Sequence, residues 1–327
     1  MSVAAFLSEL RRRDIRVRID GDRLRCNARV GALTPELRAE LRERKGDIVA
    51  FLRSAEAVAQ QQSAIVPLQQ NGERIAVFGV PGHDGDVFCY RPLAQSLGCE
   101  QPFFGLQPPG LDGQSKPLTR VEALAAYFAA QIRASQPHGP YIIAGFCAGG
   151  TVALELAQRL AAAGEPVAFL ALFGSPFPTF FQRWTQSRRW AAHQVQRIVK
   201  HTRVLAGRPW RDGLEYLKRK MEKPATALDP VLVLRAKVAR ATVIAVRAYT
   251  PKPFPGRICL FLPSKQWARA DFAALRWRAL GQPTDEYCGP DDCTHLSMLL
   301  PQNAPVFAEF FRHACGKNVD QSEVRSS

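Results

Sequence analysis

The sequence lacks several features that would assign it to a common class. None of its 8 cysteines belongs to a C-x-x-C pair, which favours free thiols in a reducing compartment over a disulfide framework. No apolar run is long enough for a membrane span, and the N-terminal stretch has the wrong charges for a signal peptide. No motif that reads DNA or RNA is present. We therefore expect a cytoplasmic protein that binds neither membrane nor nucleic acid.

The sequence also lacks a complete metal site. Cys288, Cys293 and His295 are close along the chain, as in part of a zinc site. A structural zinc ion needs four ligands, however, and no fourth ligand stands at a usable spacing. We expect neither a metal nor another cofactor.

Positive charge is abundant. The 327 residues include 44 lysines and arginines against 29 acidic residues, a net charge of +15. Because the arginines are not interleaved with aromatic residues, an acidic protein partner is a better interpretation than a nucleic acid. The length suits one large domain with a small second one.

Residues 1–53 have the pattern of a small helix-hairpin-helix unit. An amphipathic helix is predicted over 3–11, and alternating residues on both sides of Asp20-Gly21 predict a β-hairpin. Thr34 is a suitable N-cap and Pro35 a suitable first residue for a second helix, whose apolar face is Leu37, Leu41, Ile48 and Leu52. So small a core suits a binding module better than an enzyme.

A polar, alanine-rich linker over 54–66 precedes a long alternation of strands and helices. This alternation predicts a mostly parallel sheet with helices on both faces, within 67–315. The predicted strands are 74–80, 103–106, 141–144, 167–173, 257–262 and 284–288, and predicted helices include 121–134 and 151–163. Residues 176–249 are helical in pattern, aromatic and basic, so we expect a lid inserted between strands. The tail 316–327 is expected to be disordered.

Cys147 stands in the frame G-x-C-x-G within AGFCAGG. A predicted strand precedes it and a predicted amphipathic helix follows, which is the context of the nucleophile elbow of α/β-hydrolases. Gly145, Gly149 and Gly150 permit the tight turn and close helix packing that the elbow needs. We therefore interpret Cys147 as a nucleophile; the alternative is a glycine-rich turn around an ordinary buried thiol.

Two backbone N–H groups are expected to bind the oxyanion. One belongs to Ala148, directly after Cys147, and the other to His83 in the loop PGHDGD after the first predicted strand. The His83 side chain is itself an alternative catalytic group. Unpaired N–H groups at the start of the helix should also lower the pKa of the Cys147 thiol.

His295 is the predicted general base. It lies in DDCTHLSMLL, between the last predicted strand and a C-terminal helix, where the α/β-hydrolase order of catalytic residues requires the base. The remaining histidines (138, 193, 201 and 313) lie on helices, the lid or a loop away from the catalytic edge. A purely structural His295 is the alternative.

The N-terminal unit resembles a known family of docking domains. Its GDRLR and GALTPELRAELRERKGDIVAFLR are similar to the N-terminal docking domain of nonribosomal peptide and mixed peptide/polyketide synthetase subunits. The resemblance implies that the hairpin of residues 1–53 receives a short, often acidic, C-terminal segment of an upstream synthetase subunit. The alternative is an oligomerisation cap whose charges are merely solvated.

The remainder resembles the thioesterase domain that ends such assembly lines. VPGHDGDVFCYRPLAQSL, FFGLQPPGLDG, SQPHGPYIIAGFCAGGTVALELAQRL and the His295 segment carry the resemblance, over roughly residues 65–313. It implies an α/β-hydrolase fold with a helical lid. It also implies transfer of an acyl or peptidyl chain from the phosphopantetheine thiol of a carrier protein to the nucleophile, and release by water, a hydroxyl or an amine.

The sequence departs from this family at two positions. Cys147 replaces the usual serine, as in a cysteine-containing subset. The family's acid commonly follows the strand after the elbow helix, where Gly174 stands here, and the other usual location, PSKQW, also lacks one. We therefore expect a Cys147–His295 dyad, with Asp271 as a candidate orienting acid and Asp291 and Asp292 near the histidine.

Three functions remain open from the sequence. A chain-releasing thioesterase is favoured, with its substrate arriving on another polypeptide because no carrier, adenylation or condensation motif is visible. A proofreading hydrolase that clears stalled carriers is a second possibility, although a docking unit for one fixed partner argues against it. A non-catalytic scaffold is the third.

Overall fold

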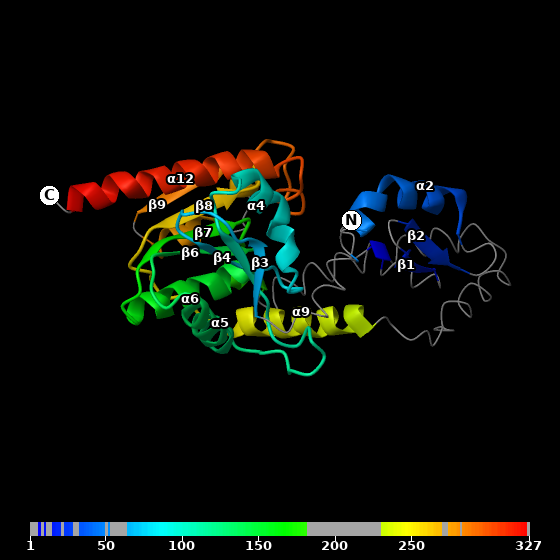
Figure 1. Cartoon of the computed structure of the whole chain (residues 1–327), viewed down its shortest axis with the longest axis horizontal. Helices are drawn as coiled ribbons and strands as arrows, with labels where there is room; N and C mark the ends of the chain where they lie inside the picture. The colour runs from blue at the N-terminus through cyan, green and yellow to red at the C-terminus, as the bar shows by residue number, and fades with distance from the viewer. Residues whose placement is uncertain are drawn as a thin grey trace. The chain divides into compact units, whose positions relative to one another are not determined.

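The structure is a computed structural model that describes residues 6–7, 10, 15–20, 23–28, 33–49, 52, 64–181, 230–269, 274–281 and 283–325 (Figure 1). The described residues fall into an N-terminal unit and a larger α/β unit, and each is considered by itself. No helix in the described ranges is long and apolar enough to cross a membrane.

The N-terminal unit contains the predicted hairpin. Strands β1 (Arg16–Asp20) and β2 (Arg23–Asn27) pair antiparallel. Asp20 is paired with Arg23 and belongs to the strand, so the connection lies one residue later than the predicted Asp20-Gly21 turn.

Helix α2 (Pro35–Glu43) begins as predicted. The Thr34 side chain accepts a hydrogen bond from the Leu37 N–H at 3.4 Å, and Pro35 occupies the first turn. The helix ends at Glu43, and residues 45–49 form a further helical segment, so the single helix expected over this region is interrupted. The predicted apolar face is nevertheless buried in one core, which contains Phe6, Leu7, Leu10, Ile15, Val17, Leu37, Leu41, Ile48 and Leu52.

The larger unit is built on a seven-stranded sheet in the order β3-β5-β4-β6-β7-β8-β9. The strands are β3 (Ile65–Gln69), β4 (Val77–Val80), β5 (Phe103–Leu106), β6 (Tyr141–Phe146), β7 (Val167–Phe173), β8 (Ile258–Leu262) and β9 (Thr284–Cys288). All neighbours are parallel except β3, which runs antiparallel to β5 at the edge. The predicted mostly parallel sheet is confirmed.

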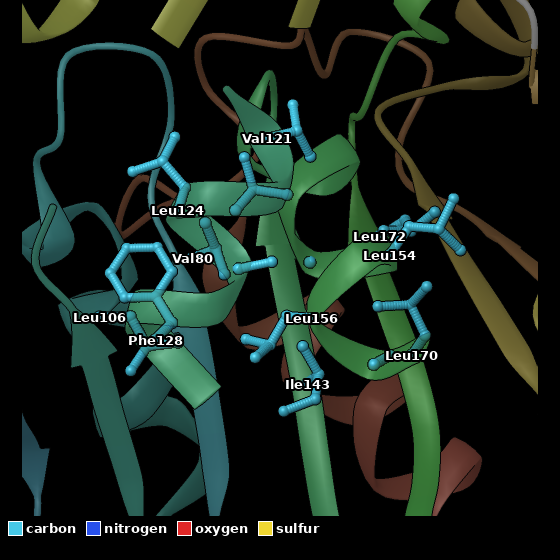
Figure 2. Packing of buried hydrophobic residues seen from close by; sticks show 14 of the residues in the cluster. Val80, Leu106, Val121, Leu124, Phe128, Ile143, Leu154, Leu156, Leu170 and Leu172 are labelled. Atoms are coloured by element: carbon cyan, nitrogen blue, oxygen red, sulfur yellow. The ribbon is translucent and has the colours of Figure 1, made fainter. Parts of the chain in front are cut away.

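Helices cover both faces of this sheet. Helices α5 (Val121–Ser135) and α6 (Gly149–Ala162) pack on one face, and α4 (Arg91–Leu97) and α12 (Ala304–Arg325) on the other (Figure 1). The strands supply alternate residues to the two faces, as their period of two requires. In β7, for example, Leu170 points to the α5/α6 core and Phe169 to the α4/α12 core. Figure 2 shows the first of these cores.

Two boundaries differ from the sequence-based expectation. Strand β3 begins at Ile65, inside the segment predicted as linker, and pairs Ile65 with Leu106. The predicted disorder over 316–327 is wrong for most of that segment, because α12 continues to Arg325. Its polar composition suggested disorder, but the helix is already formed upstream, where propagation costs little. Lys317 also donates a hydrogen bond to Asp285 on β9 at 3.0 Å.

The predicted lid over 176–249 lies mainly outside the described residues. Its described parts are η2 (Pro178–Phe181) and α9 (Pro230–Ala248). Two short helices, α10 (Lys265–Arg269) and α11 (Ala274–Arg278), connect β8 to β9.

Candidate active site

Cys147 occupies a strained turn between β6 and α6. Its φ of 55° makes it the only non-glycine residue with positive φ in the described part of the chain. A left-handed backbone costs an ordinary residue roughly 1–2 kcal/mol. Two hydrogen bonds hold the turn: the Cys147 N–H donates to the Phe173 carbonyl at 3.1 Å, and the Gly150 N–H donates to the Cys147 carbonyl at 3.2 Å. This is the backbone geometry expected of an elbow.

The glycines around Cys147 are required by close packing. A Cβ on Gly149 would overlap the Pro81 carbonyl oxygen, and one on Gly150 would overlap the Ser175 hydroxyl. A Cβ on Gly145 would lie 2.7 Å from the Cβ of Ala153 in α6. The elbow therefore packs with its backbone directly against the loop after β4 and against the end of β7.

The loop after β4 lies beside the elbow. A Cβ on Gly82 would be 3.7 Å from the Cβ of Cys147, which is ordinary van der Waals contact. The Gly85 N–H donates to the Gly82 carbonyl at 3.1 Å and closes a turn that carries His83 and Asp84. His83 is exposed at its tip. We call residues 81–84 the oxyanion loop.

Burial dominates the acidity of the thiol. Cys147 is 9 % exposed, and this burial raises the pKa of its thiol to about 12, although the Ala148 N–H, which bonds to the sulfur, lowers it. The nearby Asp84 carboxylate raises the pKa further. The predicted net lowering by the helix N-terminus is therefore wrong: one N–H acts in the predicted direction, but desolvation of the thiolate is larger.

His295 is held on a short polar loop after β9. The Thr294 N–H donates to the Ser297 hydroxyl at 2.9 Å, and the Ser297 N–H donates to the Thr294 hydroxyl at 3.2 Å. The Asn303 amide donates to the Ser297 carbonyl at 3.1 Å. These reciprocal bonds fix the backbone on both sides of His295.

The imidazole of His295 stacks on Phe146, the residue directly before Cys147. The ring centroids are 5.2 Å apart and the planes differ by 13°. Burial lowers the pKa of His295 to about 4, and the electrostatic interaction with nearby His83 lowers it further, while the Gly174 carbonyl raises it. A neutral imidazole at pH 7 is available as a base. No hydrogen bond between Cys147 and His295 occurs among the described residues.

The position where the family commonly has its acid lies next to the imidazole of His295. Gly174 lies beside His295, such that a Cβ on residue 174 would be 2.8 Å from Nδ1. Nδ1 is buried and has no hydrogen-bond partner of good geometry among the described side chains and backbone groups. Asp271, the predicted orienting acid, lies outside the described residues, whereas Asp291 and Asp292 are exposed.

Several residues at the site were not singled out from the sequence. Phe146 was only the variable position of the G-x-C-x-G frame, and its ring contact cannot be derived from spacing. Asp84 was part of the quoted loop PGHDGD but had no assigned role. Cys89 also lies near the elbow. Burial raises the pKa of its thiol well above the usual value, and the nearby Asp86, Asp84 and Cys147 raise this pKa further.

Helix α9 is tied to the elbow region at both ends. Near its start, Arg235 forms an ion pair with Asp86 at 3.3 Å, and Asp86 also accepts a hydrogen bond from the Phe88 N–H. Just after its end, the Tyr249 hydroxyl donates to Glu155 on α6 at 2.8 Å. Between them, Thr242 lines a small apolar pocket with a volume of about 10 Å³. The other lining residues are Val80, Pro81, Gly82, Pro108, Leu124, Phe128, Gly149 and Val152.

Comparisons with known proteins agree with this architecture. Residues 75–310 match the thioesterase domain family, and residues 3–54 match the TubC N-terminal docking domain. The chain is 39 % identical over 129 residues to an inactive atromentin synthetase of Paxillus involutus, and 37 % identical over 128 residues to an atromentin synthetase of the same fungus. Each match covers 39 % of this chain and 13 % of the synthetase.

A solved structure has the same fold. The NocB thioesterase domain, in covalent complex with a fluorophosphonate nocardicin G analog, superposes with a TM-score of 0.54 at 20 % identity, covering 74 % of this chain and 95 % of that domain. Together with the family match over most of its length, this likeness in fold leads to one conclusion. The chain belongs to the thioesterase domain family, with an N-terminal docking domain of the TubC type.

Proposed function

We propose that this protein is a chain-releasing thioesterase of a nonribosomal peptide or polyketide assembly line, with Cys147 as the nucleophile and His295 as the base. The observation that carries the proposal is the backbone of Cys147, a cysteine with a φ of 55° between a strand and a helix. Ordinary buried cysteines have no need of such strain, whereas an elbow requires it to raise the nucleophile above the sheet.

The first half-reaction would acylate Cys147. His295 takes the proton of the thiol while the sulfur attacks the carbonyl carbon of a carrier-bound thioester. The resulting oxyanion is bound by the N–H of Ala148, which already bonds to the sulfur, and by that of His83. Collapse breaks the carbon–sulfur bond to phosphopantetheine, and His295 returns the proton to the leaving thiolate.

The second half-reaction would transfer the acyl group to a hydroxyl, an amine or water. His295 removes a proton from the acceptor, the acceptor attacks the acyl carbon, and the Cys147 sulfur leaves and is reprotonated. Replacing one thioester by another is nearly isoenergetic, so the intermediate retains its acyl-transfer potential. This supports release by a demanding acceptor over simple hydrolysis.

The resting site would be a neutral pair. With a thiol pKa of about 12 and an imidazole pKa of about 4, both groups are uncharged at pH 7. Cys147 therefore ionises only as His295 accepts its proton, as in a serine hydrolase. Asp271 remains a candidate for orienting His295 in the complete protein.

Two partners are proposed. The docking domain would bind the C-terminal segment of an upstream synthetase subunit, for which the exposed Arg23 of β2 offers positive charge. The substrate would arrive on an acidic carrier protein. Residues 182–229 contain 12 lysines and arginines against 4 acidic residues, which favours such a carrier.

Intact-protein mass spectrometry would test the proposal. The full chain is incubated with an acyl-pantetheine thioester, with and without an added alcohol or amine. We expect an acyl adduct on wild type and none on Cys147→Ala, with discharge accelerated by the acceptor. Cys89→Ala is the matched control, because it removes a neighbouring thiol and should leave adduct formation intact. Equal labelling of wild type and Cys147→Ala would contradict the proposal.

Two alternatives would give different results. A proofreading hydrolase would discharge its adduct to water at the same rate with or without acceptor. A non-catalytic scaffold would form no adduct with any thioester, and one of the relatives is indeed named an inactive synthetase.

A further inference from the structure

To act as a base, the imidazole of His295 must be held in one orientation. In a catalytic triad, a carboxylate accepts a hydrogen bond from Nδ1–H and thereby fixes the plane and tautomer of the ring. Here the Nδ1 side of the ring lies against the backbone of Gly174, which brings no carboxylate. A dyad without any other constraint would leave the imidazole free to rotate about its side-chain bonds. Another constraint must therefore hold the ring.

One planar contact is present. Phe146 lies nearly parallel to the imidazole, with 13° between the planes and 5.2 Å between the centroids. Phe146 is the last residue of β6 and pairs in register with Phe173 of the central sheet. The strand thus gives this ring a rigid base, which a side chain on a loop would lack.

Phe146 also reaches the oxyanion loop. A Cβ on Gly82 would lie 3.5 Å from Cδ1 of Phe146, so the phenyl ring has Gly82 and His295 as neighbours. The base and the loop that carries the predicted donor His83 therefore both contact Phe146, which itself adjoins Cys147 in the chain.

We propose that Phe146 is the positioning residue of His295, fixing by ring stacking the imidazole plane that a triad carboxylate would otherwise fix. The inference rests on the proposed function. A stack limits rotation of the ring and excludes water from one face. The other contacts limit the remaining freedom: the backbone of Gly174 lies beside the Nδ1 edge, and the Thr294–Ser297 bonds fix the backbone.

A stack differs from a carboxylate in its electrostatics. A carboxylate would stabilise the imidazolium, whereas a phenyl face without water around it favours the neutral ring. Among the titratable groups, His83 on the oxyanion loop acts electrostatically on the ring, while Asp291, Asp292 and Cys293 share its loop along the chain and Cys147 directly follows Phe146. The consequence is a base that is well oriented but weak.

The test compares Phe146→Leu, which keeps an apolar side chain but no ring, with Phe146→Tyr, which keeps the ring. Phe104→Leu is the matched control, because Phe104 on β5 stacks on Phe78 and not on a histidine. Two quantities are measured on the full chain. One is the titration of His295 by NMR on histidine-labelled protein, with His295→Gln identifying the signal. The other is the rate of acylation by an acyl-pantetheine thioester.

We expect Phe146→Leu to raise the titration midpoint of His295 toward 6.5 and to lower the maximal acylation rate about 3- to 10-fold, with KM nearly unchanged. Phe146→Tyr should retain both values, as should Phe104→Leu. A His295 midpoint and an acylation rate in Phe146→Leu equal to those of wild type would overturn the inference. Equal decreases of the acylation rate in Phe146→Tyr and Phe146→Leu would also overturn it. If wild type forms no adduct but the midpoint still moves in Phe146→Leu, then the proposed function fails while the positioning role stands.

Discussion

The backbone of Gly174 lies against Nδ1 of His295, so that a Cβ on residue 174 would come within 2.8 Å of that nitrogen and 2.7 Å of the Met298 sulfur. A side chain at residue 174, where the family's acid commonly stands, would therefore overlap the imidazole of His295. An acid cannot be restored at residue 174 by substitution alone, because the ring would first have to move.

Gly174→Asp should accordingly lower activity and stability. Overpacking costs typically about 1–3 kcal/mol. The φ of 49° at Gly174 adds roughly 1–2 kcal/mol for any L-residue. Urea denaturation and acylation assays would measure both effects.

Gly174→Ala and Gly164→Ala form a matched pair for this prediction. Gly164 has a φ of 80° but open space around its Cα. Gly164→Ala should therefore cost only the free energy of the left-handed backbone. Gly174→Ala should cost more than this and should also impair acylation. Faster acylation in Gly174→Asp than in wild type would contradict the prediction.

Alkylation of Cys147 should depend on pH without a plateau near neutrality. Burial raises the thiol pKa to about 12, so the thiolate fraction keeps increasing with pH up to at least 10. Iodoacetamide labelling followed at the peptide level measures this, with the exposed Cys99 as an internal reference. A rate that levels off near pH 7 would show instead that the thiolate is the resting form.

His295 should make the protein less stable in mild acid. Its folded pKa of about 4 lies below the unfolded value of about 6.5, so the unfolded state binds the proton first. Stability is therefore complete above pH 6.5 and decreases as the pH falls toward 4, by about 3 kcal/mol in total. Denaturation of His295→Gln at several pH values should show a flatter dependence.

His138→Gln is the control for this titration. The His138 side chain is 87 % exposed and pairs with Glu165 at 3.4 Å, so its replacement should change the dependence much less than His295→Gln does. A slope in His295→Gln equal to that of wild type would mean that other groups cause the acid sensitivity.

The ion pair between Arg235 and Asp86 should contribute strongly to stability. The Arg235 side chain is 5 % exposed, and Asp86→Asn removes the carboxylate charge opposite it while keeping an oxygen near the Phe88 N–H. Removing one partner of a buried pair costs roughly 3–5 kcal/mol. Glu122→Gln, at an exposed pair with Arg120, should cost less than about 1 kcal/mol. Thermal and urea unfolding would compare the two, and equal effects would argue against the importance of the buried pair.

Cys147→Ser should acylate far more slowly than wild type. An alcohol needs more help than a thiol to lose its proton, and loss of the orienting acid reduces the rate of a serine triad about 10⁴-fold. We expect a decrease of about 10³-fold or more in the acylation rate, measured by single-turnover mass spectrometry. A serine variant within a few fold of wild type would indicate that an acid, such as Asp271, supports His295 in the complete protein.

The sequence by itself determined the architecture because local patterns were strong. Apolar runs bounded by turns predicted β5 and β7 with their observed bounds, the alternation of strands and helices predicted β9, and Thr34-Pro35 predicted the start of α2. The glycines around Cys147 predicted a close approach of backbones, which the structure confirms at Pro81 and Ser175. Antiparallel β3 was missed because its few apolar residues directly follow a polar segment, include a proline, and pair only with the distant β5.

Only the tertiary structure decided the state of the site. The helix N-terminus of Cys147 is a local feature and predicted a lowered thiol pKa, but burial by residues far away in the chain outweighs it. Likewise, the absence of an acid at Gly174 was inferred only from the resemblance to the thioesterase family, which commonly has its acid there. That His295 lies against Gly174, and that Phe146 stacks on the imidazole, depends on three segments that meet at the edge of the sheet. Desolvation of the thiol and packing of the rings arise only where segments distant in sequence come into contact, so no single stretch of sequence predicts them.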